Sequence, residues 1–294
     1  MTESGALEAA LRGHVRALCD DIGPRCLLDG DSLDRAALYI RQSFESAGLR
    51  VAEQPYDYHG RRVANLIAAP PGAGKGPAYY VVGAHYDTVP GTPGADDNAS
   101  AVAVLLELAR RLPADRPPLR LVAFTLEEPP IHLTRRQGSR VFLRAAAQNG
   151  ERVLGAIVLE MVGYTCPEQA YPLVLKWAGY PRTGDFIGIV RNRRSRRFAR
   201  SVHKGFRGNP RLPVETLSVP FDGWILPETR LSDHASFWDA RLPAVMVTDT
   251  AFFRNPNYHL PSDRPETLDY GFMAEVVRSL ELVLGALAAG KRGT

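Results

Sequence analysis

Five short apolar runs, rich in β-branched residues and with little polar alternation, constrain this chain most: Ala78–Ala84, Leu119–Leu126, Val153–Leu159, Phe186–Val190 and Ala244–Val247. Runs of this kind are typical of strands that are covered on both faces. Stretches with helical periodicity lie between several of them, at Ala99–Leu112, Ser139–Gln148 and Arg196–Phe206. Strands that alternate with helices predict an α/β fold, a three-layer α/β/α arrangement with a mixed, largely parallel central sheet.

The ends of the chain add helices and a hairpin to this pattern. Apolar residues at helical spacing predict one helix from Leu7 to Leu18, a second after Asp31 that ends at Gly48, and a last one over Glu266–Ala289. Val51–Tyr58 and Val63–Ala69 predict a hairpin. No repeat or linker interrupts the series, so we expect a single domain over 1–294. Its loop-rich segment, about 166–233, is expected to rim a site.

Composition excludes several classes of protein. With 294 residues, 45% hydrophobic and 23% charged, the chain can bury a globular core without disulfides. No apolar stretch approaches the roughly 20 residues of a membrane-spanning helix, and the N-terminus lacks the apolar centre of a signal peptide. Cys19, Cys26 and Cys166 have no paired spacing, which argues against a disulfide framework. We therefore expect a cytoplasmic protein with no membrane partner.

The formal net charge of +4 owes much to one run, Arg191–Arg200, which holds six arginines. Such a run can bind nucleic acid. No regularly spaced aromatic residues flank it, and no nucleic-acid-binding signature occurs elsewhere. The solvated start of an arginine-rich helix is the favoured interpretation, and no nucleic-acid partner is expected.

Acidic residues and histidines follow four of the predicted strands. The groups are His85 with Asp87, Asp96-Asp97-Asn98 before a helix, Glu127-Glu128, Glu160, and His259. Ligands of α/β sheets bind at the carboxyl ends of strands. Singly, each has a structural explanation, such as a helix cap for Asp97. Together these acids would repel one another without a cation, and the donor types suit Zn²⁺, or else Co²⁺ or Mn²⁺. The surplus of carboxylates favours a pair of metals that share one of them.

These motifs, with Ser232-Asp233-His234, resemble the co-catalytic zinc aminopeptidase family, which includes glutamate carboxypeptidase II, the transferrin receptor ectodomain and glutaminyl cyclase. The resemblance runs from about Ile22 to the last helix. It implies a zinc-exopeptidase-like fold and two Zn²⁺ per chain. It further implies roles for single residues: Asp97 as the shared ligand, with a cis peptide bond to Asn98; His85 and Glu160 at one metal; Glu128 and His259 at the other; Asp87 hydrogen-bonded to His85; Glu127 as the general base; and Tyr258 and Asp233 beside the site or at the oxyanion.

The chain departs from the family at a few positions. Glu160 stands where the family usually has Asp, and Ala101 where many members have Gly. The segment Ile131–Gln137, which contains His132, is unusual: it either shapes the substrate pocket or is a surface loop, and the surface loop is the favoured interpretation. His234 is a possible ligand by type, but His259 fits the motif order better. The remaining histidines, His14, His59 and His203, are expected to be surface or packing residues.

The resemblance therefore predicts a zinc-dependent aminopeptidase that releases N-terminal residues from small peptides, with Glu127 taking a proton from a metal-activated water. Three alternatives stay open. The first is a mono-zinc acyltransferase like glutaminyl cyclase, and the second is a hydrolase of N-acylated amino acids. The third is a non-catalytic binding protein on the same fold. Retention of the base and of all five ligand candidates favours catalysis. Side-chain preference and oligomeric state are not readable from the sequence.

Overall fold

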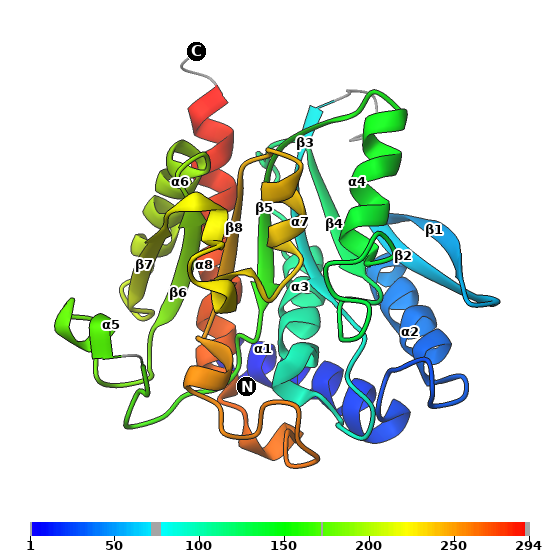
Figure 1. Ribbon diagram of the computed structural model, residues 1–294, viewed down its shortest axis with the longest axis horizontal. Helices are drawn as coiled ribbons and strands as arrows, with labels where there is room; N and C mark the ends of the chain where they lie inside the picture. The colour runs from blue at the N-terminus through cyan, green and yellow to red at the C-terminus, as the bar shows by residue number, and fades with distance from the viewer. Residues whose placement is uncertain (1, 72–77, 172, 292–294) are drawn as a thin grey trace.

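The computed structural model describes residues 2–71, 78–171 and 173–291, and eight strands in this part form one mixed sheet. The order across the sheet is β1-β2-β4-β3-β5-β8-β6-β7 (Figure 1). The strands are β1 Arg50–Tyr58, β2 Arg61–Ala69, β3 Ala78–His85, β4 Leu119–Phe124, β5 Arg152–Glu160, β6 Ile187–Asn192, β7 Val214–Val219 and β8 Ala244–Thr248.

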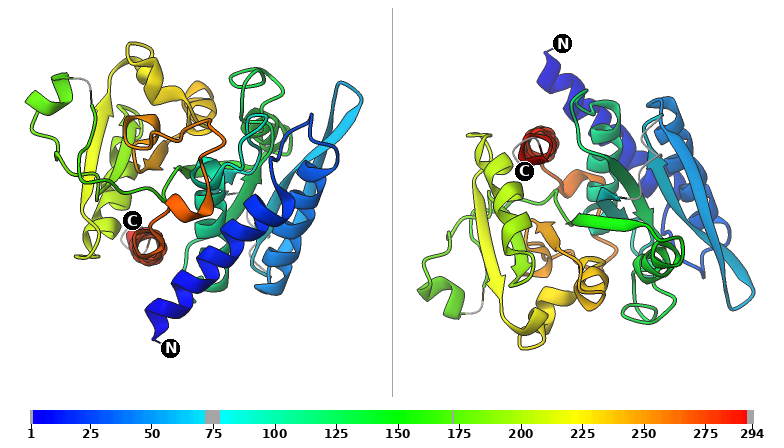
Figure 2. Two further views of the ribbon diagram at one scale, coloured as in Figure 1. Left: turned by 90° about the horizontal axis from the view of Figure 1, so that it is seen from below. Right: turned by 90° about the horizontal axis from the view of Figure 1, so that it is seen from above.

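Helices cover both faces of the sheet, which gives the three layers expected from the sequence (Figure 2). On one face lie α1 Glu3–Arg16, α2 Ser32–Ser46, α3 Ala101–Arg110, α6 Arg196–Arg207 and α8 Tyr270–Lys291. On the other lie α4 Gly138–Gln148 and α7 His234–Asp239. The apolar core is divided accordingly, because alternate residues of the central strands face opposite helix layers. Ile157 and Leu159 of β5 lie in one cluster and Val158 in the other.

Strand direction brings the chemistry to one edge. β3 is parallel to β4 and β5, and β5 is parallel to β8. Their carboxyl ends therefore meet at the lower edge in Figure 1, beside the loops that connect β8 to α8. β6 runs antiparallel to β8, and β7 is parallel to β6, so these two strands begin at that same edge.

The segment 166–233 holds more regular structure than the sequence predicted. It includes β7 and the short helix α5 Leu173–Trp177, in addition to the expected β6 and α6. In the arginine run, Arg193, Arg194, Arg196, Arg197 and Arg200 are exposed around the start of α6, as the solvated-helix interpretation predicted. α8 begins at Tyr270, after a short 3₁₀ turn, rather than at Glu266.

The three cysteines are free, as expected. Within the described residues, no helix has the length and apolar character needed to cross a bilayer. The single-domain organisation over 1–294 stays a prediction.

Candidate metal centre

The five predicted ligands gather at the carboxyl edge of the sheet in two overlapping groups. His85, Asp97 and Glu160 form one group, and Asp97, Glu128 and His259 form the other. Within each group the candidate ligand atoms all lie within 4.8 Å of one another. Asp97 belongs to both, which is the arrangement expected of a shared carboxylate.

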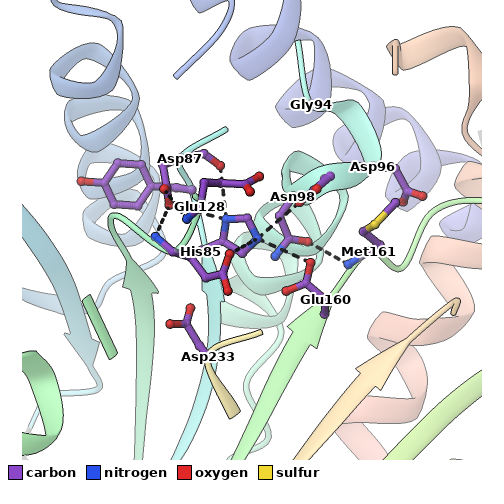
Figure 3. Close-up of polar contacts among 12 residues, drawn as sticks. His85, Asp87, Gly94, Asp96, Asn98, Glu128, Glu160, Met161 and Asp233 are labelled. Atoms are coloured by element: carbon purple, nitrogen blue, oxygen red, sulfur yellow. Dashed lines mark hydrogen bonds and ion pairs between the residues drawn. The ribbon is translucent and has the colours of Figure 1, made fainter. Parts of the chain in front are cut away.

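Each oxygen of Asp97 faces a different histidine. His85 Nε2 lies 3.3 Å from Asp97 Oδ1 and 3.5 Å from Glu160 Oε1 (Figure 3). On the other side, His259 Nε2 lies 3.1 Å from Asp97 Oδ2 and 3.2 Å from Glu128 Oε2. The carboxylate of Asp97 therefore separates two sites, each of which contains one imidazole and one further glutamate.

Buried polar atoms without a hydrogen-bond partner test whether these residues fit metal ions. Each of the five candidates has such an atom: His85 Nε2, Asp97 Oδ1, Glu128 Oε1, Glu160 Oε2 and His259 Nε2. An unpaired buried polar atom is costly, and a cation between the groups would satisfy all five. Two imidazoles and three carboxylates suit zinc. The donor set therefore fits divalent metal ions such as zinc.

The pKa shifts of the candidate ligands show how closely their charges are packed at this edge of the sheet. Burial raises the pKa of Glu160 to about 7 despite the opposing effect of His85. Burial and the charge of Asp97 raise the pKa of Glu128. Burial works against a charged His259, yet the nearby carboxylates of Asp97 and Glu128 raise its pKa to about 10. When all of these acids are ionised, they repel one another unless positive charge lies between them.

The loop that carries Asp97 is fixed by groups from distant segments. Gly94 has a positive φ of 58°, and a Cβ there would lie 2.3 Å from the Asp97 carbonyl oxygen, so only glycine fits. The Asp263 carboxylate accepts hydrogen bonds from the backbone N–H groups of Asp96 and Asp97. The Asn98 side chain donates to the Leu159 carbonyl and accepts from the Met161 N–H. The Asn98 side chain therefore connects this loop to the residues on both sides of Glu160. The peptide bond between Asp97 and Asn98 is cis, as predicted.

Asp87 fixes the glutamate pair more than it fixes His85. Its two carboxylate oxygens accept hydrogen bonds from the backbone N–H groups of Glu127 and Glu128, at 3.0 and 3.1 Å. The His85 Nδ1 contact goes to the Asp87 carbonyl oxygen at 3.2 Å, and the nearest carboxylate oxygen is 3.5 Å away. The predicted side-chain hydrogen bond to His85 is thus replaced by one to the backbone.

The interpretation of Ile131–Gln137 as a plain surface loop was wrong for His132. His132 Nδ1 lies 2.6 Å from Glu127 Oε1, with only 13% of the histidine side chain exposed. The N–H groups of Ile131 and His132 both donate to the Glu128 carbonyl, and this tight turn folds the imidazole back over Glu127. The other oxygen, Glu127 Oε2, lies 4.0 Å from His85 Nε2 and therefore faces the metal site.

Asp233 lies beside the same residues, from the segment just before α7 (Figure 3). Its Oδ1 accepts a hydrogen bond from Gln137 Nε2, and its Oδ2 is buried without a partner. Burial and the charge of Glu127 raise the pKa of Asp233 to about 8. Gln137 Oε1 also accepts from the Leu133 N–H, so one buried amide joins Asp233 to the loop of His132. Sequence reasoning missed Gln137, because nothing in its neighbourhood marks it.

The other histidines lie outside the two groups. His234 Nε2 contacts the Thr229 carbonyl oxygen at 2.8 Å, and its ring packs on Trp238. Burial lowers the pKa of His234 to about 3, which suits a neutral packing residue. His14 contacts Tyr39 and Glu107, far from the sheet edge. By contrast, Tyr258 stacks on the His259 imidazole with ring centroids 3.8 Å apart.

The carboxyl edge of the sheet that carries the five candidate ligands is called the metal edge below. A largely apolar pocket opens beside it. Glu160 and Tyr258 line its inner end, and its floor is the face of β8, β6 and β7 that carries Met246, Val190 and Leu217. Its walls are contributed by Tyr171, Leu175, Tyr180 and Phe186, and by the segments 228–231 and 250–253. A pocket of this kind beside two candidate metal sites is suited to one substrate side chain.

A comparison with known protein families assigns the fold and its lineage. Residues 65–283 match the model of peptidase family M28. The chain belongs to this family. It is 40% identical over 281 residues to the uncharacterized protein YfbL of Escherichia coli strain K12, covering 91% of this chain and 84% of that protein.

Solved structures agree on the fold. LapB from Legionella pneumophila aligns with a TM-score of 0.75 at 18% identity, over 97% of this chain and 73% of LapB. BSAP, a zinc aminopeptidase from Bacillus subtilis, aligns at 0.71 and 17% identity, over 96% of this chain and 95% of BSAP. The glutaminyl cyclase of Porphyromonas gingivalis aligns at 0.67 and 18% identity, over 95% and 97%. This M28 chain therefore shares its fold with a zinc aminopeptidase and a glutaminyl cyclase.

Proposed function

We propose that this protein is a zinc-dependent aminopeptidase, a single catalytic domain over 1–294 that holds two metal ions. The observation that carries the proposal is the set of five orphaned buried ligand atoms, arranged around both oxygens of Asp97. His85 and Glu160 complete one site, and Glu128 and His259 complete the other. Membership of the M28 family supports a peptidase, and the zinc aminopeptidase of similar fold supports zinc.

Metal ions held here would lower the pKa of a water molecule and polarise the scissile carbonyl. Glu127 is the general base in this proposal. Its Oε2 faces the metal side of the site and accepts the proton of the attacking water, and it later returns the proton to the leaving amine.

Two neighbours hold Glu127 in place. Asp87 fixes the backbone of Glu127 and Glu128 through both of its carboxylate oxygens. His132 occupies Oε1 at 2.6 Å, which leaves Oε2 directed at the metal side. Because carboxylates accept but do not donate, this contact needs a hydrogen on His132 Nδ1. We assign His132 as a positioning residue for the base.

Tyr258 and Asp233 lie beside the proposed reaction centre, Tyr258 next to His259 and Asp233 near Glu127. Tyr258 keeps the His259 imidazole in its orientation by stacking on it, and it also lines the inner end of the pocket. Asp233 is held by Gln137 beside the loop of His132. The pocket accepts the side chain of the substrate's N-terminal residue, which makes release of single residues the expected reaction.

A substrate panel distinguishes this proposal from its alternatives. Purified protein loaded with zinc is incubated with leucinamide, N-acetyl-leucinamide and glutaminamide, and the products are separated by mass. We expect ammonia release from leucinamide and none from the acetylated substrate, because the free amino group defines an aminopeptidase. Cyclisation of glutaminamide without hydrolysis of leucinamide would assign the protein to the glutaminyl cyclase type. Cleavage of the acetyl–nitrogen bond of the acetylated substrate, with release of acetate and no hydrolysis of leucinamide, would make it an N-acyl amino acid hydrolase.

A further inference from the structure

A single row of paired positions leads from the metal edge to the outer edge of the sheet. Glu160 pairs with Thr248, Thr248 with Gly188, and Gly188 with Glu215. Directly paired positions share a face of the sheet, and all four residues line the pocket. Because neighbouring strands lie about 4.8 Å apart, the row spans about 14 Å between the backbones of Glu160 and Glu215.

The middle of this row carries no side chain, because its residue is Gly188. A Cβ there would lie 3.3 Å from the Thr248 carbonyl oxygen, closer than ordinary contact, and 3.8 Å from the methyl groups of Thr248 and Thr250, so glycine keeps this part of the floor low. The adjacent row of the floor consists of Met246, Val190 and Leu217. An extended apolar stem can therefore lie over Gly188 and pack on this second row. A short side chain bound at the metal edge ends before it reaches β7.

The outer end of the pocket, at β7, is formed by the Glu215 carboxylate and by aromatic rings. Glu215 is half-buried, and its carboxylate makes no hydrogen bond or ion pair with the described residues. The rings of Tyr171, Tyr180 and Phe186 line the same end, with the Tyr171 centroid 6.2 Å from Tyr180 and 6.5 Å from Phe186. The Tyr171 hydroxyl is buried without a partner, and Glu215 interacts with it electrostatically.

This combination is specific for positive charge. Aromatic faces attract ammonium and guanidinium groups, and a carboxylate without a partner adds a charge-assisted hydrogen bond. The Arg254 guanidinium lies 4.6 Å from the Phe186 centroid. It already donates to Gln169 and to the Phe186 carbonyl, and it interacts with the buried Asp249. Arg254 therefore does not fill the place beside Glu215. His203 of α6 interacts electrostatically with Glu215, but burial and the charge of Arg207 lower the pKa of His203, so it is not a fixed cation.

We propose that the outer end of this pocket binds the cationic end of an N-terminal lysine or arginine, with Glu215 as the residue that determines the preference. The inference rests on the proposed aminopeptidase function and specifies its substrate class. The four-carbon stem of lysine, or the shorter stem of arginine with its guanidinium, lies along the row over Gly188. Norleucine has nearly the same stem without the charge, so it separates the contribution of Glu215 from that of apolar packing.

The test compares kcat/KM for the amides of lysine, arginine, norleucine and leucine on the zinc-loaded full chain. We expect lysinamide to exceed norleucinamide by about 10- to 100-fold, the range for a hydrogen bond to a charged group. In Glu215→Gln this ratio is expected to approach one, and in Glu215→Lys to fall below one. The matched control is Asp185→Asn, which removes one exposed negative charge next to Phe186 but outside the pocket. It should keep the wild-type ratio.

The outcomes separate the two proposals. Equal or better turnover of norleucinamide by the unmodified chain overturns the inference while the aminopeptidase function stands, and this result does not depend on any variant folding. A Glu215→Gln protein that keeps its preference for lysinamide also overturns it. Absence of hydrolysis with all four amides contradicts the proposed function itself.

Discussion

The two ends of the substrate region are built on different principles. At the metal edge the acids are buried, and hydrogen bonds from distant segments fix the loop of Asp97 and the backbone of Glu128. At the outer end of the pocket, Glu215 is half-buried and has no hydrogen bond or ion pair with the described residues. The first arrangement holds groups that must act on every substrate. The second leaves a group free to interact with a particular one.

Substitutions in these two regions should have different effects on activity. Changes at the metal edge should lower the turnover of all substrates together, whereas changes over β6 and β7 should alter the ranking of substrates. This follows because transition-state interactions are common to all peptides, while side-chain contacts are not. The variants below are ordered from the largest expected effect to the smallest.

Glu127→Gln removes the proposed base and keeps the size of the side chain. We expect kcat to fall about 1,000-fold for lysinamide and leucinamide alike, within the range for general acid–base catalysis. Zinc content by mass spectrometry should match that of the unmodified chain, because Glu127 belongs to neither ligand group. Turnover within tenfold of the unmodified chain would remove Glu127 from this role.

Asp97→Asn weakens the carboxylate shared by both sites. We expect lower zinc content at both positions and a smaller zinc-dependent gain in thermal stability. For the unmodified chain, zinc at 1,000 times its dissociation constant contributes about 4 kcal/mol per site to the free energy of unfolding. Melting temperature is measured with and without chelator. An equal gain in the variant would show that Asp97 does not bridge the ions.

His132 tests the positioning of the base, since its contact uses Nδ1 rather than Nε2. The amide of Asn can take the place of Nδ1, whereas that of Gln extends to the place of Nε2. We expect His132→Ala and His132→Gln to lower kcat about 10-fold or more with little change in KM, and His132→Asn to restore most of it. A merely structural role predicts no such difference between Asn and Gln. Equal losses in these two variants would count against the assignment.

Gly188→Val tests whether the floor of the pocket determines the ranking of substrates. The added side chain would project into the row between Thr248 and Glu215. We expect turnover of lysinamide to fall about 10-fold relative to alaninamide, comparable to losing favourable contact in a side-chain pocket. Melting temperature provides the control for folding. A parallel loss with both amides would place the effect at the metal edge instead.

The proximity of the candidate ligands could be predicted from the sequence because several of them follow buried strands. The ends of β3, β4 and β5 are marked by continuous apolar runs, so the sequence alone assigns His85, Glu128 and Glu160 to one edge of the sheet. The same reasoning predicted the layers and the parallel centre of the sheet, and family membership agrees with both.

The pocket side was harder to predict for physical reasons. β7 lies at the edge of the sheet and mixes polar with apolar residues, so Val214–Val219 lacks the apolar run that marked the central strands. The position of Glu215 depends on the register of four strands, which no local pattern contains. The contact between His132 and Glu127 was not predicted, because it depends on a tight turn after Glu128. Pairing and turns of this kind are set by the folded chain rather than by residue type.

A zinc titration of the metal-free protein tests the central claim most directly. Protein stripped by chelator is supplied with zinc in steps, and leucinamide hydrolysis is measured at each step. The account predicts activity that rises with added zinc and reaches its plateau at about two ions per chain. A plateau at one ion, or hydrolysis that persists without metal, would contradict the two-metal centre around Asp97.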